Sequence, residues 1–303
     1  MFNRVEGNPL AQELIDQFPK WARDRCPVPD SYFEHREERA PFLLELPEEF
    51  LVPASGVQTK AVRNWLVHCL EVAKTQADER TTQQDFCGLV ISPESEQTIT
   101  RYWVGLGDQL PPGGQDSVLF RYHDPRVMQR VWPTLSLSQQ SRWMGPVTQW
   151  WSLTQPWGPG IEEPESAGWF RAETPNLSPG TSVAASPRHL FNAAQWFVSG
   201  VSPDANLIWR SYADNNIPAL AQPDPQSMVQ MIADAEGMGL QELNIEDYVW
   251  ITWMHNPKEG AARARDWGLP HLAPILSRIQ DQLRDQPDAR FSTLFVKATQ
   301  SEK

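Results

Sequence analysis

The 303-residue chain has few cysteines and a deficit of positive charge. Its three cysteines, Cys26, Cys69 and Cys87, are odd in number and none lies in a C-x-x-C spacing. We therefore expect no disulfide framework and a reducing compartment. Lys and Arg number 26 against 38 Asp and Glu, which gives a formal net charge of -12. Because nucleic acids and anionic membranes attract basic surfaces, this balance argues against both as partners.

The chain also has no long apolar run. The stretch from Gly88 to Ile91 is among the longest, whereas a membrane-spanning helix needs roughly 20 apolar residues. The opening residues, Met1 to Gly7, are not followed by the apolar core of a signal peptide. We therefore expect a protein that stays in the cytoplasm.

Motifs of common catalytic and cofactor sites are missing as well. The sequence has no G-x-S-x-G, no G-x-x-x-x-G-K-[ST] and no H-E-x-x-H. Gly105-x-Gly107 is followed by Leu110 where a dinucleotide-binding loop needs a third glycine. The six histidines show no metal-ligand spacing. We predict no catalytic residue, no metal and no cofactor.

The most enzyme-like pair is His123-Asp124, because an aspartate can orient a catalytic histidine. Adjacent residues that follow a strand rarely make that contact, and Asp124 is well placed to cap a helix that begins at Pro125. A hydrolase that uses His123 and Asp124 is therefore the alternative, and the sequence favours a protein that is not an enzyme.

Helices and strands alternate in the first half of the chain. Apolar residues recur at helical spacing over Gln58 to Ala77, and Ser92-Pro93 predicts the cap and first position of a helix that carries Trp103. An amphipathic helix from Leu10 to Arg25 is interrupted by Pro19. A second short helix is predicted from Ser136 to Trp143. Short apolar runs predict strands at 41–47, 86–91, 118–122, 147–153 and 168–172.

The composition changes from Gln155 to Pro187, where Pro, Gly, Ser and Glu dominate. This stretch predicts a surface connection, and the pattern beyond it is helical. The fold class is an α/β N-terminal lobe, with a small mixed sheet flanked by helices, followed by a compact α-helical C-terminal lobe. The predicted parts are an N-terminal helical extension (1–40), an α/β domain (41–155), the connection (156–187) and a helical lobe (188–303).

The stretch from Leu119 to Trp150 reads LFRYHDPRVMQRVWPTLSLSQQSRWMGPVTQW. It resembles the Tap/Tec adaptor-chaperone family of type VI secretion, in which an F-R-x-x-D-P-R segment precedes two helices and a G-P followed by Trp. The matching positions are Phe120, Arg121, Asp124, Pro125, Arg126, Gly145, Pro146 and Trp150. The resemblance covers roughly 41–151, with a weaker helical match beyond Leu190. The Pro/Gly-rich stretch after Trp157 has no counterpart in the family pattern.

The resemblance implies an adaptor chaperone that binds the N-terminal region of a cognate effector and promotes its loading onto the VgrG spike. The residues also give the motif a structural explanation, with Phe120 in the core, Asp124 as a helix cap and the arginines paired with Asp124 or with carbonyls. We favour this explanation over direct contact with a partner. A structural component of the secretion baseplate is a further alternative. Since tryptophan is enriched at interface hot spots, the candidate effector contacts are Trp196, Trp209, Trp253 and Trp267. We expect several of the C-terminal tryptophans to be core residues instead, and at least one of Trp250 and Trp253, which share a helical face, to be buried.

Overall fold

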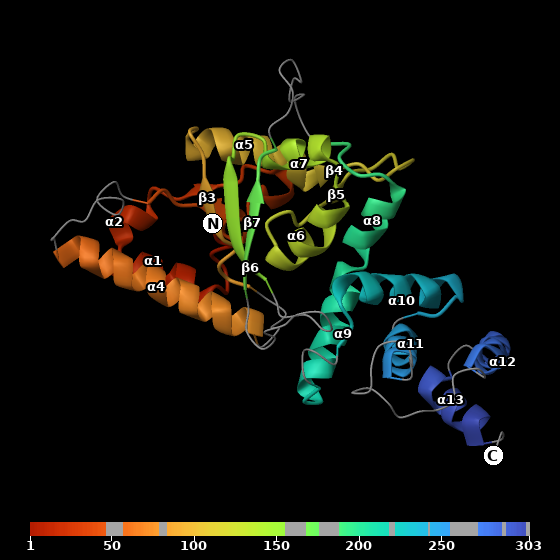
Figure 1. Cartoon of the computed structure of the whole chain (residues 1–303). Helices are drawn as coiled ribbons and strands as arrows, with labels where there is room; N and C mark the ends of the chain where they lie inside the picture. The colour runs from red at the N-terminus through yellow and green to blue at the C-terminus, as the bar shows by residue number, and fades with distance from the viewer. Residues whose placement is uncertain are drawn as a thin grey trace. The chain divides into compact units, whose positions relative to one another are not determined.

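A computed structural model describes residues 1–46, 57–78, 84–154, 168–175, 188–217, 222–241, 243–254, 272–286 and 289–300. The chain divides into two compact units (Figure 1). The first holds the described residues of Met1–Pro156 and Ser166–Gly200, and the second those of Val201–Lys303. The predicted connection therefore contributes a strand to the first unit, and its residues 156–167 and 176–187 lie outside the described part of the chain.

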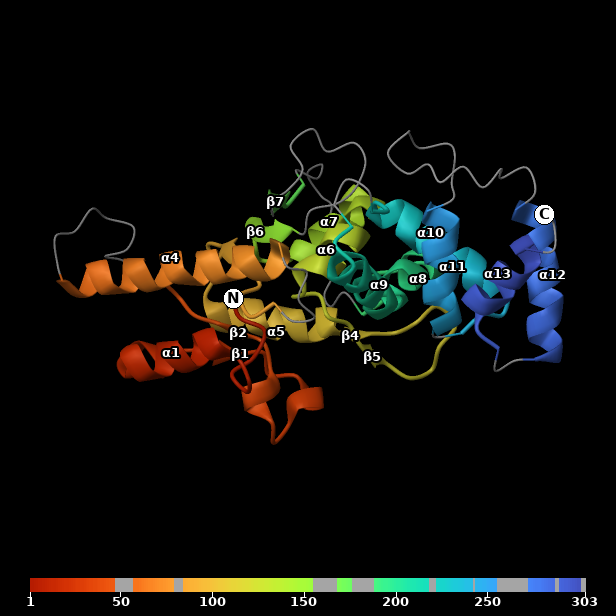
Figure 2. The same cartoon turned by 90° about the horizontal axis from the view of Figure 1, so that it is seen from below.

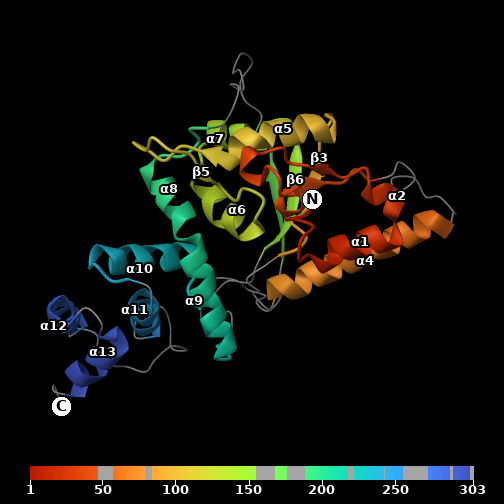
Figure 3. The same cartoon turned by 180° about the vertical axis from the view of Figure 1, so that it is seen from behind.

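The N-terminal helices of the first unit are α1 (Pro9–Gln17), α2 (Pro19–Ala22) and α4 (Val57–Asp78). The predicted interruption at Pro19 is confirmed, because Pro19 begins the separate helix α2. The Asn8 side chain caps α1 by accepting a hydrogen bond from the Ala11 amide at 3.0 Å. Leu14 of α1 and Trp65 of α4 share one buried cluster, and Figure 3 shows the two helices side by side. The first forty residues thus pack into the first unit.

Seven short strands form three sheets in the described residues, and every pairing is antiparallel. The small sheets pair β1 (Cys26–Pro27) with β2 (Phe42–Leu43), and β4 (Asp108–Gln109) with β5 (Val118–Leu119). The third has the order β3 (Leu89–Ile91), β6 (Gln149–Thr154), β7 (Gly168–Glu173). The predicted α/β class is confirmed, with antiparallel sheets in place of one mixed sheet.

The remaining helices of this unit are α5 (Glu96–Gly107), α6 (Pro125–Val131), α7 (Leu137–Met144) and α8 (Ala193–Gly200), with 3-10 turns at Ser31–Phe33, Glu37–Arg39 and Trp132–Thr134. The predicted start of α5 at Ser92-Pro93 is wrong. Ser95 caps the helix by accepting from the Thr98 amide at 3.3 Å. The Ser92 hydroxyl instead donates to the carbonyl of Pro146 at 2.7 Å, so a contact distant in sequence engages this serine.

The second unit is helical, as predicted, and contains α9 (Ser202–Asp214), α10 (Pro225–Gly237), α11 (Leu243–Met254), α12 (Leu272–Asp285) and α13 (Phe291–Gln300) (Figure 2). Asp224 caps α10 by accepting from the amides of Gln226 and Ser227, both at 2.9 Å. Arg290, just before α13, pairs with Asp247 of α11 through two hydrogen bonds of 2.9 and 2.6 Å. None of the described helices in either unit has the length and apolar character to cross a bilayer.

Candidate functional site

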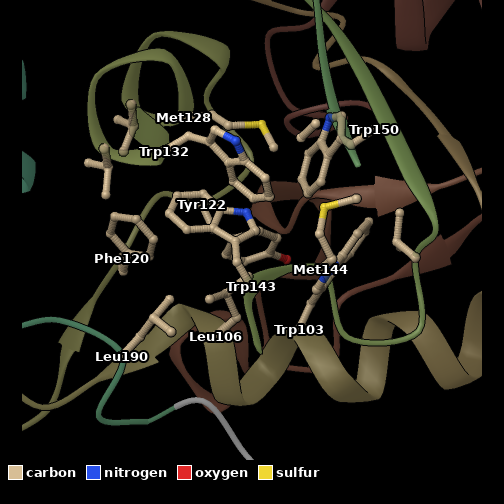
Figure 4. Close-up of a cluster of buried hydrophobic side chains, with 14 of the residues drawn as sticks. Trp103, Leu106, Phe120, Tyr122, Met128, Trp132, Trp143, Met144, Trp150 and Leu190 are labelled. Atoms are coloured by element: carbon tan, nitrogen blue, oxygen red, sulfur yellow. The ribbon is translucent and has the colours of Figure 1, made fainter. Parts of the chain in front are cut away.

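The segment from Phe120 to Trp150 contains the residues singled out by the sequence, and it begins in an aromatic core. Phe120 is buried after β5, and its ring meets Trp143 and Phe191 edge-on at centroid distances of 5.2 and 4.7 Å. Tyr122 is buried beside Trp103 at 5.5 Å. Figure 4 shows the rings of Trp103, Phe120, Tyr122 and Trp143 converging from α5, α7 and the chain after β5. The first motif residue is therefore a core residue, as predicted.

Asp124 and Pro125 begin α6 in the predicted way. The Asp124 carboxylate accepts from the Arg126 amide at 3.0 Å and so caps the helix, while Pro125 occupies the first turn, where no amide donor is needed. The same carboxylate accepts two hydrogen bonds from the Arg126 guanidinium, from Nε at 2.9 Å and Nη2 at 2.7 Å. Cap and ion pair together use both carboxylate oxygens.

The electrostatics of this pair follow from burial. The side chains of Arg126 and Asp124 are only 5% and 11% exposed. Burial alone would raise the pKa of Asp124, but the charge and hydrogen bonds of Arg126 outweigh it and lower that pKa to about 2. Arg130 is also buried, and loss of solvation lowers its pKa to about 9, against the attraction of Asp124. Asp124 therefore stays ionised and holds positive charge inside the fold.

Gly145, Pro146 and Trp150 connect α7 to the central sheet. Gly145 has φ +55°, and a Cβ there would lie 2.2 Å from the ring of Tyr102, whose hydroxyl donates to the Arg142 carbonyl at 2.5 Å. Only glycine fits this turn without displacing that ring. Trp150 is buried between its strand neighbours and contacts Trp103 at 5.1 Å. Gly145 therefore lets the chain turn against Tyr102, and Trp150 packs in the core beside Trp103.

The alternative catalytic pair is not assembled in the described geometry. His123 is half-buried, and its Nδ1 has no hydrogen-bond partner in the structure. Loss of solvation lowers the pKa of His123 to about 4, despite the opposing effect of the adjacent carboxylate. The described hydrogen bonds of the Asp124 carboxylate go to Arg126. A neutral imidazole beside an occupied carboxylate lacks the contact that orients a general base.

Arg121, the remaining charged motif residue, differs from Arg126 in its surroundings. Its side chain is exposed, whereas Arg126 is buried against Asp124. The arginines were predicted to pair with Asp124 or with carbonyls. Arg126 pairs with Asp124, and the Asp124 hydrogen bonds described above do not involve Arg121. Of the charged motif side chains, Arg121 is the one on the surface.

Three glutamines that were not predicted as functional residues hold the end of the first unit: Gln139 and Gln195 join it to the motif segment, and Gln109 joins it to β4. The Gln139 amide donates to the Leu190 carbonyl at 2.6 Å, and the Gln195 amide donates to the Thr134 carbonyl at 2.7 Å. Gln109, fully buried, accepts from the Leu190 amide at 3.1 Å. Two of these glutamines could have been identified from the sequence. Gln139 belongs to the capping-box pattern Ser136-x-x-Gln139, and Gln195 follows Asn192 at the same spacing.

The tryptophans predicted to contact an effector have different environments. Trp209 and Trp253 are 0% and 1% exposed, so the structure places both in the core of the second unit and corrects their prediction as surface contacts. The Trp209 indole donates to the Pro223 carbonyl at 3.0 Å. Trp196 on α8 is half-buried and retains some exposed surface. Trp267 lies outside the described residues.

The cysteines are free, in agreement with the predicted lack of disulfides. Cys69 and Cys87 are buried, and burial raises the pKa of the Cys69 thiol to about 12 and that of Cys87 in the same direction. Thiols held in the neutral form are poor nucleophiles. Within the described ranges, no three His, Cys, Asp or Glu side chains gather as a metal site would require.

One comparison with known proteins gives a match. Residues 8–142 match the model of a domain of unknown function, DUF4123, which is known as the Tap, or type VI secretion effector adaptor-type, domain. No curated protein and no solved structure is similar to the chain. The matched range includes the motif from Phe120 to Arg126 and ends before Gly145. Over these residues, less than half of its length, the chain is similar to this domain family.

Proposed function

We propose that the protein is a cytoplasmic, non-enzymatic adaptor that binds a cognate type VI secretion effector and promotes its loading onto the VgrG spike. The observation that carries the proposal is that the motif side chains form structural contacts within the fold. Asp124 is committed to Arg126 and the cap of α6, while Phe120 and Trp150 pack in the core. The motif builds a scaffold, and the similarity to DUF4123 over 8–142 supports an adaptor role for that scaffold.

An adaptor needs apolar surface that a partner can cover. Several large apolar side chains of the first unit are exposed, among them Leu137 at the start of α7 and Ile91 at the end of β3. Single exposed apolar side chains are common on protein surfaces. They indicate an interaction site only where several lie next to one another. The net charge of -12 supports partners that are proteins rather than nucleic acids.

The direct test is capture of the effector. The affinity-tagged chain is co-expressed with the product of the reading frame downstream of its own gene, and the complex is isolated and sized. We expect a stable complex, and loss of effector delivery from cells that lack the adaptor. Failure to form a complex, together with unchanged delivery, would refute the proposal.

Arg121 separates a scaffold role of the motif from a contact role. Arg121→Ala removes an exposed motif charge while the Asp124–Arg126 pair remains intact. We expect Arg121→Ala to bind effector as tightly as the unaltered protein, because the scaffold is unchanged. A large loss of binding at unchanged stability would instead place the effector on the motif itself.

A further inference from the structure

Strand β7 lies at one edge of the three-stranded sheet. In the order β3-β6-β7 it pairs with β6 on one side, and Figure 1 shows it as the last strand of that sheet. Its six residues are twice the number in β3 at the other edge. A strand of this length at an edge presents unpaired backbone groups that another extended chain can use.

The register of β6 and β7 identifies these backbone groups. The Thr174 amide donates to the Thr148 carbonyl at 3.0 Å, so these opposed residues form a hydrogen-bonded pair. Hydrogen-bonded and non-hydrogen-bonded pairs alternate along an antiparallel ladder. The N–H and C=O groups of Trp169, Arg171 and Glu173 therefore point away from β6. Among the described residues, no hydrogen bond joins these outward groups to another segment.

The side chains of the same three residues share one face of the sheet and are exposed. Trp169 is 48% exposed, and the Arg171 and Glu173 side chains are exposed to 47% and 48%. Arg171 Nε lies 3.1 Å from Glu173 Oε1, and the Arg171 guanidinium lies over the ring of Trp151, 5.2 Å from its centroid. Stacking and pairing hold Arg171 in place, so binding has less side-chain entropy to overcome there.

We infer that the outer side of β7 is the docking site for an extended segment of the effector, which adds to the sheet as a fourth strand. This inference rests on the proposed adaptor function and names the surface that performs it. Backbone hydrogen bonds to Trp169, Arg171 and Glu173 supply affinity, and the exposed side chains beside them supply selectivity. The surface is distinct from the tryptophans predicted from the sequence.

Charge and shape along the strand define the chemistry of the docked segment. Cross-strand neighbours on one face interact most favourably when charges are opposite and apolar groups meet. The segment therefore carries an apolar or aromatic side chain opposite Trp169, an acidic one opposite Arg171 and a basic one opposite Glu173. These three side chains alternate with others that point to the opposite face, so they recur at every second position.

Two variants test the edge. Arg171→Pro removes an outward amide and places a ring on the outer side, while the ladder to β6 keeps its own hydrogen bonds. The exchange Arg171→Glu with Glu173→Arg keeps the amides and the ion pair within β7 but reverses the order of charges. Val67→Ser on α4 is the control for a change elsewhere on the surface of the first unit, because Val67 is exposed to 48% and the Arg171 and Glu173 side chains to 47% and 48%. Each variant is first compared with the unaltered protein by circular dichroism and thermal unfolding.

Effector binding to the full chain is measured by calorimetry, and amide hydrogen exchange is recorded with and without effector. We expect both β7 changes to weaken binding at least about tenfold, since several backbone and charged contacts are involved, and the control to have no effect. The amides of Trp169, Arg171 and Glu173 should exchange more slowly in the complex. If Arg171→Pro does not fold, the variant with Arg171→Glu and Glu173→Arg and the amide hydrogen exchange still test the docking site.

The outcomes separate the two proposals. If the unaltered protein binds effector while both β7 variants bind equally well and the three amides stay unprotected, the docking site is refuted and the adaptor function stands. If the unaltered protein binds no effector, the adaptor function fails and the docking site with it.

Discussion

Replacing Asp124 with asparagine removes the charge from the buried pair with Arg126 but leaves an oxygen that caps α6. The pKa of Asp124 is lowered from 3.8 to about 2 in the folded protein. At 1.4 kcal/mol per tenfold change in a protonation equilibrium, this lowering is worth about 2 kcal/mol at neutral pH. Asp124→Asn leaves a guanidinium that is 5% exposed without its carboxylate, and we expect a loss of about 2–4 kcal/mol of unfolding free energy.

Asp124→Ala loses the cap as well, and should be less stable by about 1 kcal/mol more. The double change Asp124→Asn with Arg126→Met removes both charges, so its loss should be smaller than the sum of the two single losses. Urea unfolding followed by tryptophan fluorescence and circular dichroism gives the free energies. An Asp124→Asn protein as stable as the unaltered one would refute the role of the pair, and equal stability of the Asn and Ala variants would refute the cap.

The pH dependence of the same variants gives an independent check. A carboxylate whose folded pKa is depressed stabilises the protein fully above its unfolded pKa, here near 4, and loses that stabilisation as the pH falls toward about 2. Asp124→Asn has no carboxylate to titrate, so its stability should change less over that interval. A difference between the two proteins that is constant across this range would contradict the assigned ionisation.

Three further predictions concern neighbouring residues. The pKa of His123 is about 4 in the folded protein against an ordinary value of 6.5, so the free energy of unfolding should fall by about 3 kcal/mol as the pH falls from 6.5 to 4. His123→Phe should flatten that part of the curve of stability against pH, and an unchanged curve would contradict the loss of solvation of the ring. Gly145→Ala should cost about 2–4 kcal/mol in urea unfolding, because its Cβ meets the Tyr102 ring, and a neutral effect would show that the ring yields freely. Gln195→Ala removes the donor to the Thr134 carbonyl and should cost about 1–2 kcal/mol and speed amide exchange in α8, whereas unchanged exchange would show that other contacts hold this helix.

Features set by neighbours in the chain were predictable from the sequence. The helix start at Asp124-Pro125 and the capped helix after Ser136 follow from side chains that bond to amides two or three residues away. Ser92 shows where this reasoning stops. Ser92 was predicted as the cap that Ser95 provides, and the contact of Ser92 with the Pro146 carbonyl, 54 residues away, is not visible in local sequence.

Burial of individual tryptophans was likewise beyond a sequence pattern. Trp209 and Trp253 lie on helices whose apolar faces the spacing identifies, yet which aromatic ring enters the core depends on how several helices pack. For the same reason β7 was predicted as a strand but not as a sheet edge. An edge is defined by strand order, and strand order comes from contacts distant along the chain.

The amide contacts of Gln139 and Gln195 have a consequence for synthesis of the protein. They join positions 51 and 61 residues apart, and Phe191 completes the ring cluster around Phe120. While the ribosome is still producing the stretch before Leu190, Phe120 and Trp143 lack their last cover. The nascent first unit therefore exposes aromatic surface until Phe191 has been added. A fragment cut at residue 142, where the domain similarity ends, would lack both Trp143 and Phe191, so its Phe120 ring would stay uncovered and favour aggregation.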